Sequence, residues 1–173
     1  MYTIISATHR PGSNSLKVAH IYLQILQDQG IEAKLLSLTD LPHDFIFTNS
    51  FGSRTERFQQ IVDLYISPAR KFILVAPEYN GGMPGIFNAF VDAVTPDPFR
   101  GKKVAMVGVA AGRGGNVRGM DHQTNCFHYM GVNVYHQFVT LSQILSMGNK
   151  HGELGGEVLV NLLKKQALGF MAY

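Results

Sequence analysis

The sequence has a single cysteine and no tryptophan, and charged residues are only 16% of its 173 residues. One cysteine, Cys126, excludes a disulfide within the chain and leaves no paired thiol for redox chemistry. No apolar run approaches the ~20 residues that cross a bilayer. The first residues also lack the basic and apolar regions of a signal peptide. We therefore expect a cytoplasmic protein that does not enter a membrane.

Metal, hydrolase and nucleotide-triphosphate motifs are missing as well. The seven histidines form neither an HExxH pair nor a zinc-finger pair, and His122 and His128 are six positions apart. No serine lies in a GxSxG elbow, and no GxxxxGK[ST] loop occurs. We therefore expect no metal site and neither hydrolase nor P-loop chemistry.

The positive charge of the chain is not concentrated in one place. The formal net charge is +3, and the longest basic clusters are pairs such as Lys102–Lys103 and Lys164–Lys165. A nucleic-acid binder would gather its basic residues on one stripe with aromatic residues between them. We expect no nucleic-acid partner, although a mildly basic chain favours small anionic ligands.

Short apolar runs alternate with helical patterns along the chain. The strands are expected at 2–7, 31–38, 71–76, 102–110 and near 133–139, and the helices at 16–29, 58–65, 84–94, up to about 130, and 157–168. Residues 39–54 look like a loop, and Pro84 suits the first position of its helix. This alternation predicts an α/β fold with a parallel sheet between two helical layers. About five strands favour a flavodoxin-like sandwich with strand order 2-1-3-4-5, in one domain spanning residues 1–173.

In such sheets a ligand lies outside the carboxyl ends of the strands, near the point where the strand order reverses. Three unusual loops follow the first, third and fourth strands: "THRPGSNS" (8–15), "PEYNGGMP" (77–84) and "AGRGGN" (111–116). The parallel sheet brings all three loops to one edge. The candidate site is therefore at that edge.

The first loop supplies hydroxyl, amide and guanidinium groups and runs directly into a helix. A helix N-terminus presents free N–H groups and a positive dipole end, which together suit a phosphate. Serine and asparagine are also the commonest N-caps and need no ligand. Arg10 adds a guanidinium, which a helix cap does not require and which would suit a phosphate. Both interpretations remain open at this stage.

The second and third loops have features that suit a flat polar ring. Gly81 and Gly82 would let backbone donors approach such a ring, and the amide of Asn80 both donates and accepts. Tyr79 would pack beside the ring or on a partner subunit; alternatively, Tyr79 is a core residue and Glu78 caps a helix. The third loop is no dinucleotide fingerprint, because Val117 occupies the position of the third glycine. Its glycines either serve a turn that needs positive φ or let the main chain approach the edge of a ring closely.

The segments "SATHRPGSNS", "PEYNGGMPG" and "GKKVAMVGVAAGRGG" resemble the cofactor loops of the NADPH-dependent FMN reductase family. The family includes quinone, azo-dye and chromate reductases, and the likeness runs from the first strand to about Asn116. It implies FMN as cofactor, NADPH or NADH as reductant and a small-molecule electron acceptor. It also implies a homodimer or a homotetramer. By this likeness the phosphate is held by Thr8, Arg10, Ser13, Asn14 and Ser15, the ring and ribityl chain by Pro77, Glu78, Tyr79, Asn80 and Gly81, and the pyrimidine edge by Gly112, Arg113 and Gly114.

The chain departs from the family pattern at two places in these loops. Ala7-Thr8 stands where Gly-Ser is usual, and Ala111 stands where a serine is common.

In the resemblance, hydride passes from the nicotinamide to the flavin, which carries the chemistry, so no catalytic acid or base is expected. Arg113 would stabilise negative charge on the reduced ring. Two alternatives are a one-electron flavodoxin carrier, which would usually be acidic, and a scaffold without a cofactor.

Overall fold

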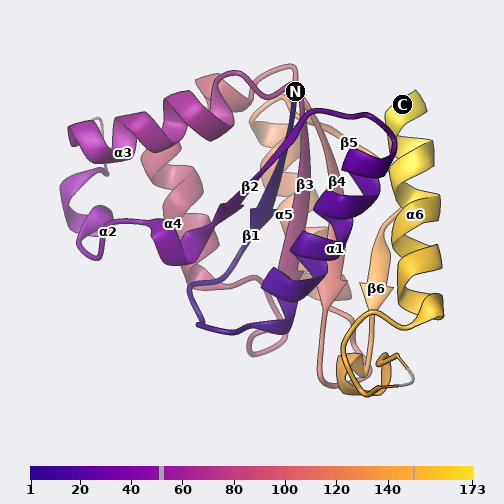
Figure 1. Cartoon of the computed structure of the whole chain (residues 1–173). Coiled ribbons are helices and arrows are strands. Elements are labelled where there is room, and N and C mark those ends of the chain that lie inside the picture. Colours follow the sequence, from indigo (N-terminus) through magenta and orange to yellow (C-terminus); the bar gives the residue numbers. More distant parts are fainter. Residues whose placement is uncertain (51–52, 150) are drawn as a thin grey trace.

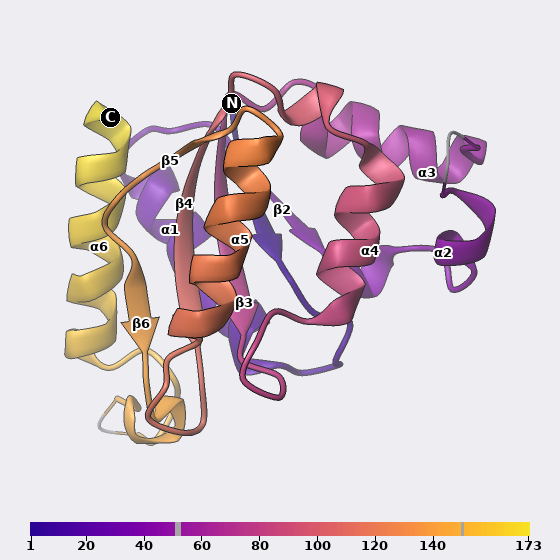
Figure 2. The same cartoon turned by 180° about the vertical axis from the view of Figure 1, so that it is seen from behind.

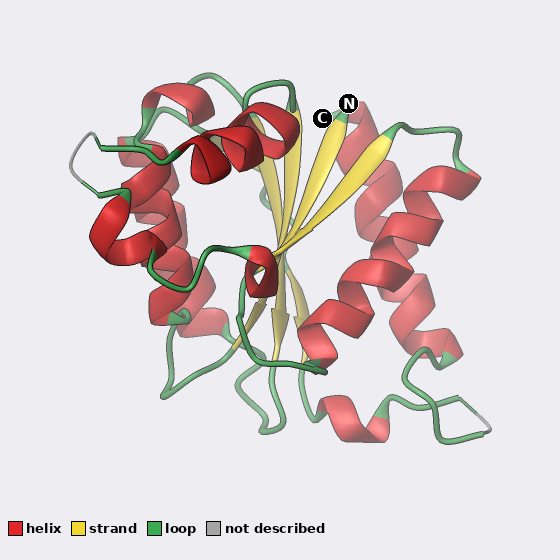
Figure 3. Ribbon diagram, turned by 60° about the vertical axis from the view of Figure 1, so that its left-hand side comes forward, coloured by secondary structure: helices red, strands yellow, loops and turns green. Residues whose placement is uncertain are grey.

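The computed structural model describes residues 1–50, 53–149 and 151–173. They form one six-stranded parallel sheet with helices around it (Figure 1 and Figure 3). The strand order is β2-β1-β3-β4-β5, which confirms the prediction, and β6 also pairs with β4. The strands are β1 (Tyr2–Ser6), β2 (Ala33–Ser37), β3 (Lys71–Pro77), β4 (Lys103–Val109), β5 (Asn133–Val134) and β6 (Val139–Leu141). The central strands are buried on both faces, which is why they appear in the sequence as continuous apolar runs.

Helices cover both faces of the sheet (Figure 1 and Figure 2). Two core clusters result, one between the sheet and α1 and α6, the other between the sheet and the remaining α-helices. The α-helices are α1 (Asn14–Asp28), α2 (Phe45–Thr48), α3 (Glu56–Ile61), α4 (Gly85–Val94), α5 (Val117–Tyr129) and α6 (Glu157–Ala172). None of the helices in the described ranges is long and apolar enough to span a membrane.

The outer edge of the sheet is interrupted, where the sequence indicated one short strand. β5 pairs with the start of β4 and β6 with its end. Between them, the side-chain amide of Gln166 donates to Met106 O at 2.9 Å and to Gln137 O at 2.7 Å. A side chain from α6 thus takes the place of ladder hydrogen bonds, and it divides the edge strand in two.

Several element boundaries differ from the prediction. α1 begins at Asn14, earlier than expected, because Ser13 Oγ accepts the Leu16 N–H at 3.2 Å and caps the helix. Gly30 follows the end of α1 with φ 70°, the predicted stop. Pro84 is the cap of α4 rather than its first residue. The expected loop 39–54 contains α2, and residues 51–52 lie outside the described part.

The helix expected at 58–65 changes form before it ends. After α3 the backbone continues as a π-helical turn, Val62–Ile66. Two side chains donate to its carbonyls: Thr3 Oγ1 in β1 donates to Tyr65 O at 2.6 Å, and Lys102 Nζ, one residue before β4, donates to Ile66 O. Pro68 has no N–H to continue the helix. The wide turn therefore fixes this helix end to the sheet.

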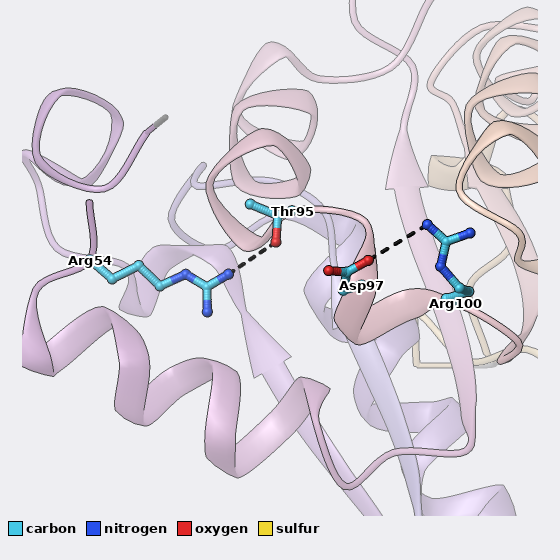
Figure 4. Close-up of polar contacts among 4 residues, drawn as sticks. All are labelled: Arg54, Thr95, Asp97 and Arg100. Carbon is cyan, nitrogen blue, oxygen red and sulfur yellow. Dashed lines mark hydrogen bonds and ion pairs between the residues drawn. The ribbon is translucent and has the colours of Figure 1, made fainter. Parts of the chain in front are cut away.

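Arg54 closes the C-terminal end of α4. Its guanidinium donates to Val94 O, to Thr95 Oγ1 at 3.2 Å (Figure 4) and to Gln59 Oε1 at 3.0 Å. Thr95 has φ 67°, an unfavourable value for a β-branched residue. The neighbouring pair of Asp97 and Arg100, 3.6 Å apart, is exposed and adds little stability. Arg54 thus stabilises the C-terminal end of α4, where Thr95 has an unfavourable backbone conformation.

Candidate functional site

A cavity of about 390 Å³ lies at the carboxyl edge of the sheet, where the sequence predicted the site. Its volume is within the range of about 300–1,000 Å³ that small-molecule sites occupy. The lining residues are Arg10–Ser15, Pro77–Tyr79, Val109, Ala111, Ile144 and Leu145. No group of three or more His, Cys, Asp or Glu side chains that could hold a metal ion occurs in this cavity or elsewhere in the described residues.

One end of the cavity is suited to an anion. The N–H groups of Asn14 and Ser15, in the first turn of α1, have no carbonyl one turn earlier to accept them. Gly12 has φ 65°, a left-handed conformation that glycine adopts readily, in the turn that leads into α1. The Arg10 side chain is exposed beside it and adds a positive charge. The helix dipole, the N–H groups and the guanidinium act together on a ligand placed there.

Thr8 belongs to the same loop but lies behind the cavity wall. It is only 1% exposed, and the cavity lining does not include it. Its Oγ1 accepts the Arg10 N–H at 3.2 Å and is 2.8 Å from Tyr79 Oη. Thr8 therefore joins the first loop to the second.

The second loop is a two-residue hairpin turn. Tyr79 and Gly82 exchange both backbone hydrogen bonds at 3.0 Å. The residues between them, Asn80 and Gly81, have φ values of 51° and 76°. A turn with positive φ at both central positions is of type I′, which strongly favours Asn-Gly. These two residues have a conformational reason to be present, and neither lines the cavity.

Glu78 and Asn116 fasten the second loop to the third. Glu78 Oε2 accepts the N–H of Asn116, the residue that precedes α5, at 2.9 Å. The Asn116 side chain donates to Ala76 O at 3.2 Å and to Pro77 O at 3.1 Å. A Cβ at Gly114 would lie 2.7 Å from Glu78 Oε2, so a larger residue there would displace this carboxylate from its present position. Glu78 thus binds the start of a helix, as one of the two interpretations held, while it also lines the cavity.

The rest of the third loop lies outside the cavity lining. Gly112, Arg113 and Gly114 are exposed, and only Ala111 reaches the lining. Gly112 O accepts the Gln143 N–H at 2.8 Å, and Arg113 O accepts from Ser142 Oγ at 2.9 Å. The third loop is therefore held by the segment that follows β6.

The sequence analysis missed part of the site, the apolar end formed by Ile144 and Leu145. Both line the cavity after β6, and Leu145 is 79% exposed. Val109, at the end of β4, lies in the same lining. The rule that ligands bind at carboxyl strand ends applies to the last strand as well, and it could have found them. The cavity thus joins an anion-binding end to an apolar surface.

We expect replacement of Asn116 to loosen both loops. Asn116→Gly removes the hydrogen bonds to Ala76 O and Pro77 O and should lower the free energy of unfolding by about 1–3 kcal/mol. Asn116→Ala should cost about 1 kcal/mol more, because Asn116 has φ 62° and a Cβ disfavours that conformation. Urea unfolding measures both, with the exposed Asn161→Ala on α6 as control. An Asn116→Gly variant as stable as the parent would contradict this role.

This chain resembles known proteins in sequence and in fold. The model of the NADPH-dependent FMN reductase family matches residues 2–145, which takes the likeness past Asn116 and into the segment with Ile144 and Leu145. NAD(P)H-dependent FMN reductase PA1204 of Pseudomonas aeruginosa is 30% identical over 132 residues, 74% of this chain and 69% of that protein.

Solved structures agree in fold. FerB, a flavoenzyme NAD(P)H:(acceptor) oxidoreductase from Paracoccus denitrificans, superposes with a TM-score of 0.80 at 19% identity, over 99% of this chain and 95% of that one. A flavodoxin of Streptococcus pneumonia TIGR4 gives 0.65 at 16% identity, over 99% and 97%. These likenesses confirm the flavodoxin-like architecture. The family-model match over residues 2–145 and the 30% identical relative show that this chain belongs to the NADPH-dependent FMN reductase family.

Proposed function

We propose that this chain, a single cytoplasmic domain of residues 1–173, passes reducing equivalents from NAD(P)H through FMN to a small acceptor. The acceptor would be a quinone, an azo compound, a metal oxyanion or free flavin. The observation that carries the proposal is the cavity at the sheet edge, which joins the α1 N-terminus to an apolar surface. FMN has two parts that match these, a phosphate for the α1 N-terminus and a flat ring for the apolar surface.

The described residues fit FMN in that orientation. Arg10, Ser13, Asn14 and Ser15 would hold the phosphate, since they surround the positive end of the α1 dipole. The ring and ribityl chain would lie along Pro77 and Glu78 and against the apolar residues Ile144 and Leu145. Asn80 and Gly81 would act by shaping the hairpin, and Thr8 by supporting Tyr79.

Bound FMN would supply the two-electron chemistry, so that NAD(P)H, a proton and an acceptor become NAD(P)⁺ and a reduced acceptor. The protein's part is to orient the reactants and to stabilise charge. We propose that Arg113, with Gly112 and Gly114 beside it, faces the mouth of the cavity and offsets negative charge that develops on reduction. Its guanidinium forms no ion pair among the described residues.

Anaerobic mixing tests the reductase against the electron carrier. We expect the visible flavin bands of the FMN-loaded protein to bleach after NADPH or NADH is added, and to return when a suitable acceptor follows. A panel of a quinone, an azo dye, chromate and free FMN ranks the acceptors by rate. Bands that persist with both nucleotides but bleach with dithionite would indicate a carrier and contradict the proposal.

We also propose that the chain is a homodimer that uses the groove between α4 and α5 as its interface. The two helices lie side by side on one face of the sheet (Figure 2). A cavity of about 1030 Å³ runs between them and is lined in part by Val91, Tyr129 and Met130. Gln123, only 1% exposed, lines it too, and its Oε1 has no partner among the described residues. A second copy would cover this apolar surface.

Sedimentation equilibrium checks the interface. We expect the parent chain to be dimeric, or tetrameric as a pair of dimers, and Tyr129→Glu to dissociate this contact by burying a charge. Tyr129 is 88% exposed in the single chain, so the change should not unfold it. Val158→Glu, at an exposed position on α6, is the matched control and should leave the assembly intact. A monomeric parent, or a Tyr129→Glu variant that assembles normally, would contradict the proposal.

A further inference from the structure

The contact between Thr8 and Tyr79 shows where the tyrosine hydroxyl acts. Tyr79 Oη is 2.8 Å from Thr8 Oγ1, which in turn accepts the Arg10 N–H at 3.2 Å. The phenol therefore reaches from the second loop to the first loop, beside the start of α1. The polar end of Tyr79 therefore lies at the loop that carries Arg10.

The hydrogen atoms of the pair can be assigned from burial. Within the described part of the chain, Tyr79 Oη is the only acceptor with which the Thr8 hydroxyl forms a hydrogen bond. Thr8 is 1% exposed, so its O–H cannot turn to solvent instead. A buried donor without an acceptor is costly. Thr8 therefore donates to Tyr79, and the phenol's own hydrogen is directed elsewhere.

The surroundings select an anionic acceptor for that hydrogen. Tyr79 and Arg10 line the same cavity, together with the first turn of α1. The cavity's one carboxylate, that of Glu78, is already engaged by the Asn116 N–H at 2.9 Å. A guanidinium and helix N–H groups beside the phenol favour a group of negative charge.

We propose that Tyr79, oriented by Thr8, donates its phenolic hydrogen bond to the phosphate of the bound flavin nucleotide, rather than packing on the flavin ring. This rests on the proposed function, which places a phosphate at this end of the cavity. Tyr79 is then a phosphate ligand supplied by the ring-binding loop. Thr8, which replaces the usual serine of the family pattern, is a positioning residue behind it.

Paired titrations with FMN and riboflavin test the inference, because the two flavins differ only in the phosphate. The full chain, freed of flavin, is titrated with each while flavin fluorescence is followed. We expect Tyr79→Phe to weaken FMN binding by about tenfold or more, as for a lost hydrogen bond to a charged group. Riboflavin binding should be unchanged. Tyr173→Phe, at an exposed position after α6 and outside the cavity lining, is the control.

Thr8 variants test the orienting role. Thr8→Val should weaken FMN binding and spare riboflavin, Thr8→Ser should retain affinity, and Thr8→Val combined with Tyr79→Phe should lose little more than either change alone. Thermal melts show whether each variant is folded. Equal weakening of both flavins by Tyr79→Phe would place Tyr79 at the ring and overturn the inference, as would no change in either. A parent chain that binds neither flavin would instead overturn the proposed function.

Discussion

The hydrogen bonds of Asn116 at the end of β3 set the shape of the site. Ala76 and Pro77 are the last residues of β3, and one buried amide donates to both of their carbonyls. Glu78 completes the link by accepting the N–H of the same residue. The third loop is bonded in turn to the segment after β6. Three walls of the cavity therefore form one connected unit, and the contact between Thr8 and Tyr79 attaches the fourth.

Sequence patterns were enough for the sheet because its signals are local. The run 72–76 is apolar throughout since β3 is covered on both faces, and Gly30 ends α1 where the pattern stops. The interrupted edge could not be predicted, because Gln166 on the last helix divides it and nothing near residues 133–141 shows this. The cap formed by Arg54, and the π turn fixed by Lys102, depend on tertiary contacts of the same kind.

The candidate site, like the sheet, could be predicted in part from the sequence. Parallel topology dictated that the first, second and third loops meet, and the residues from Arg10 to Ser15 and from Pro77 to Tyr79 do share a cavity. Sequence did not separate residues that could touch a ligand from those that shape a loop. Asn80 and Gly81 satisfy a type I′ turn, and Gly114 makes room for a carboxylate. Contacts of these residues with a cofactor stay predictions. Ile144 and Leu145 carry no motif, and only their position after a strand identifies them.

The central claim is that one cavity takes FMN with its phosphate at the start of α1, beside Arg10. The most direct measurement is the visible spectrum of the protein after incubation with FMN and gel filtration. The account predicts flavin bands that co-elute with the protein at one FMN per chain. It also predicts that Arg10→Gln sharply lowers this retained flavin, because a charged contact to the phosphate is lost. A parent chain that elutes without flavin, even after incubation with excess FMN, would contradict it.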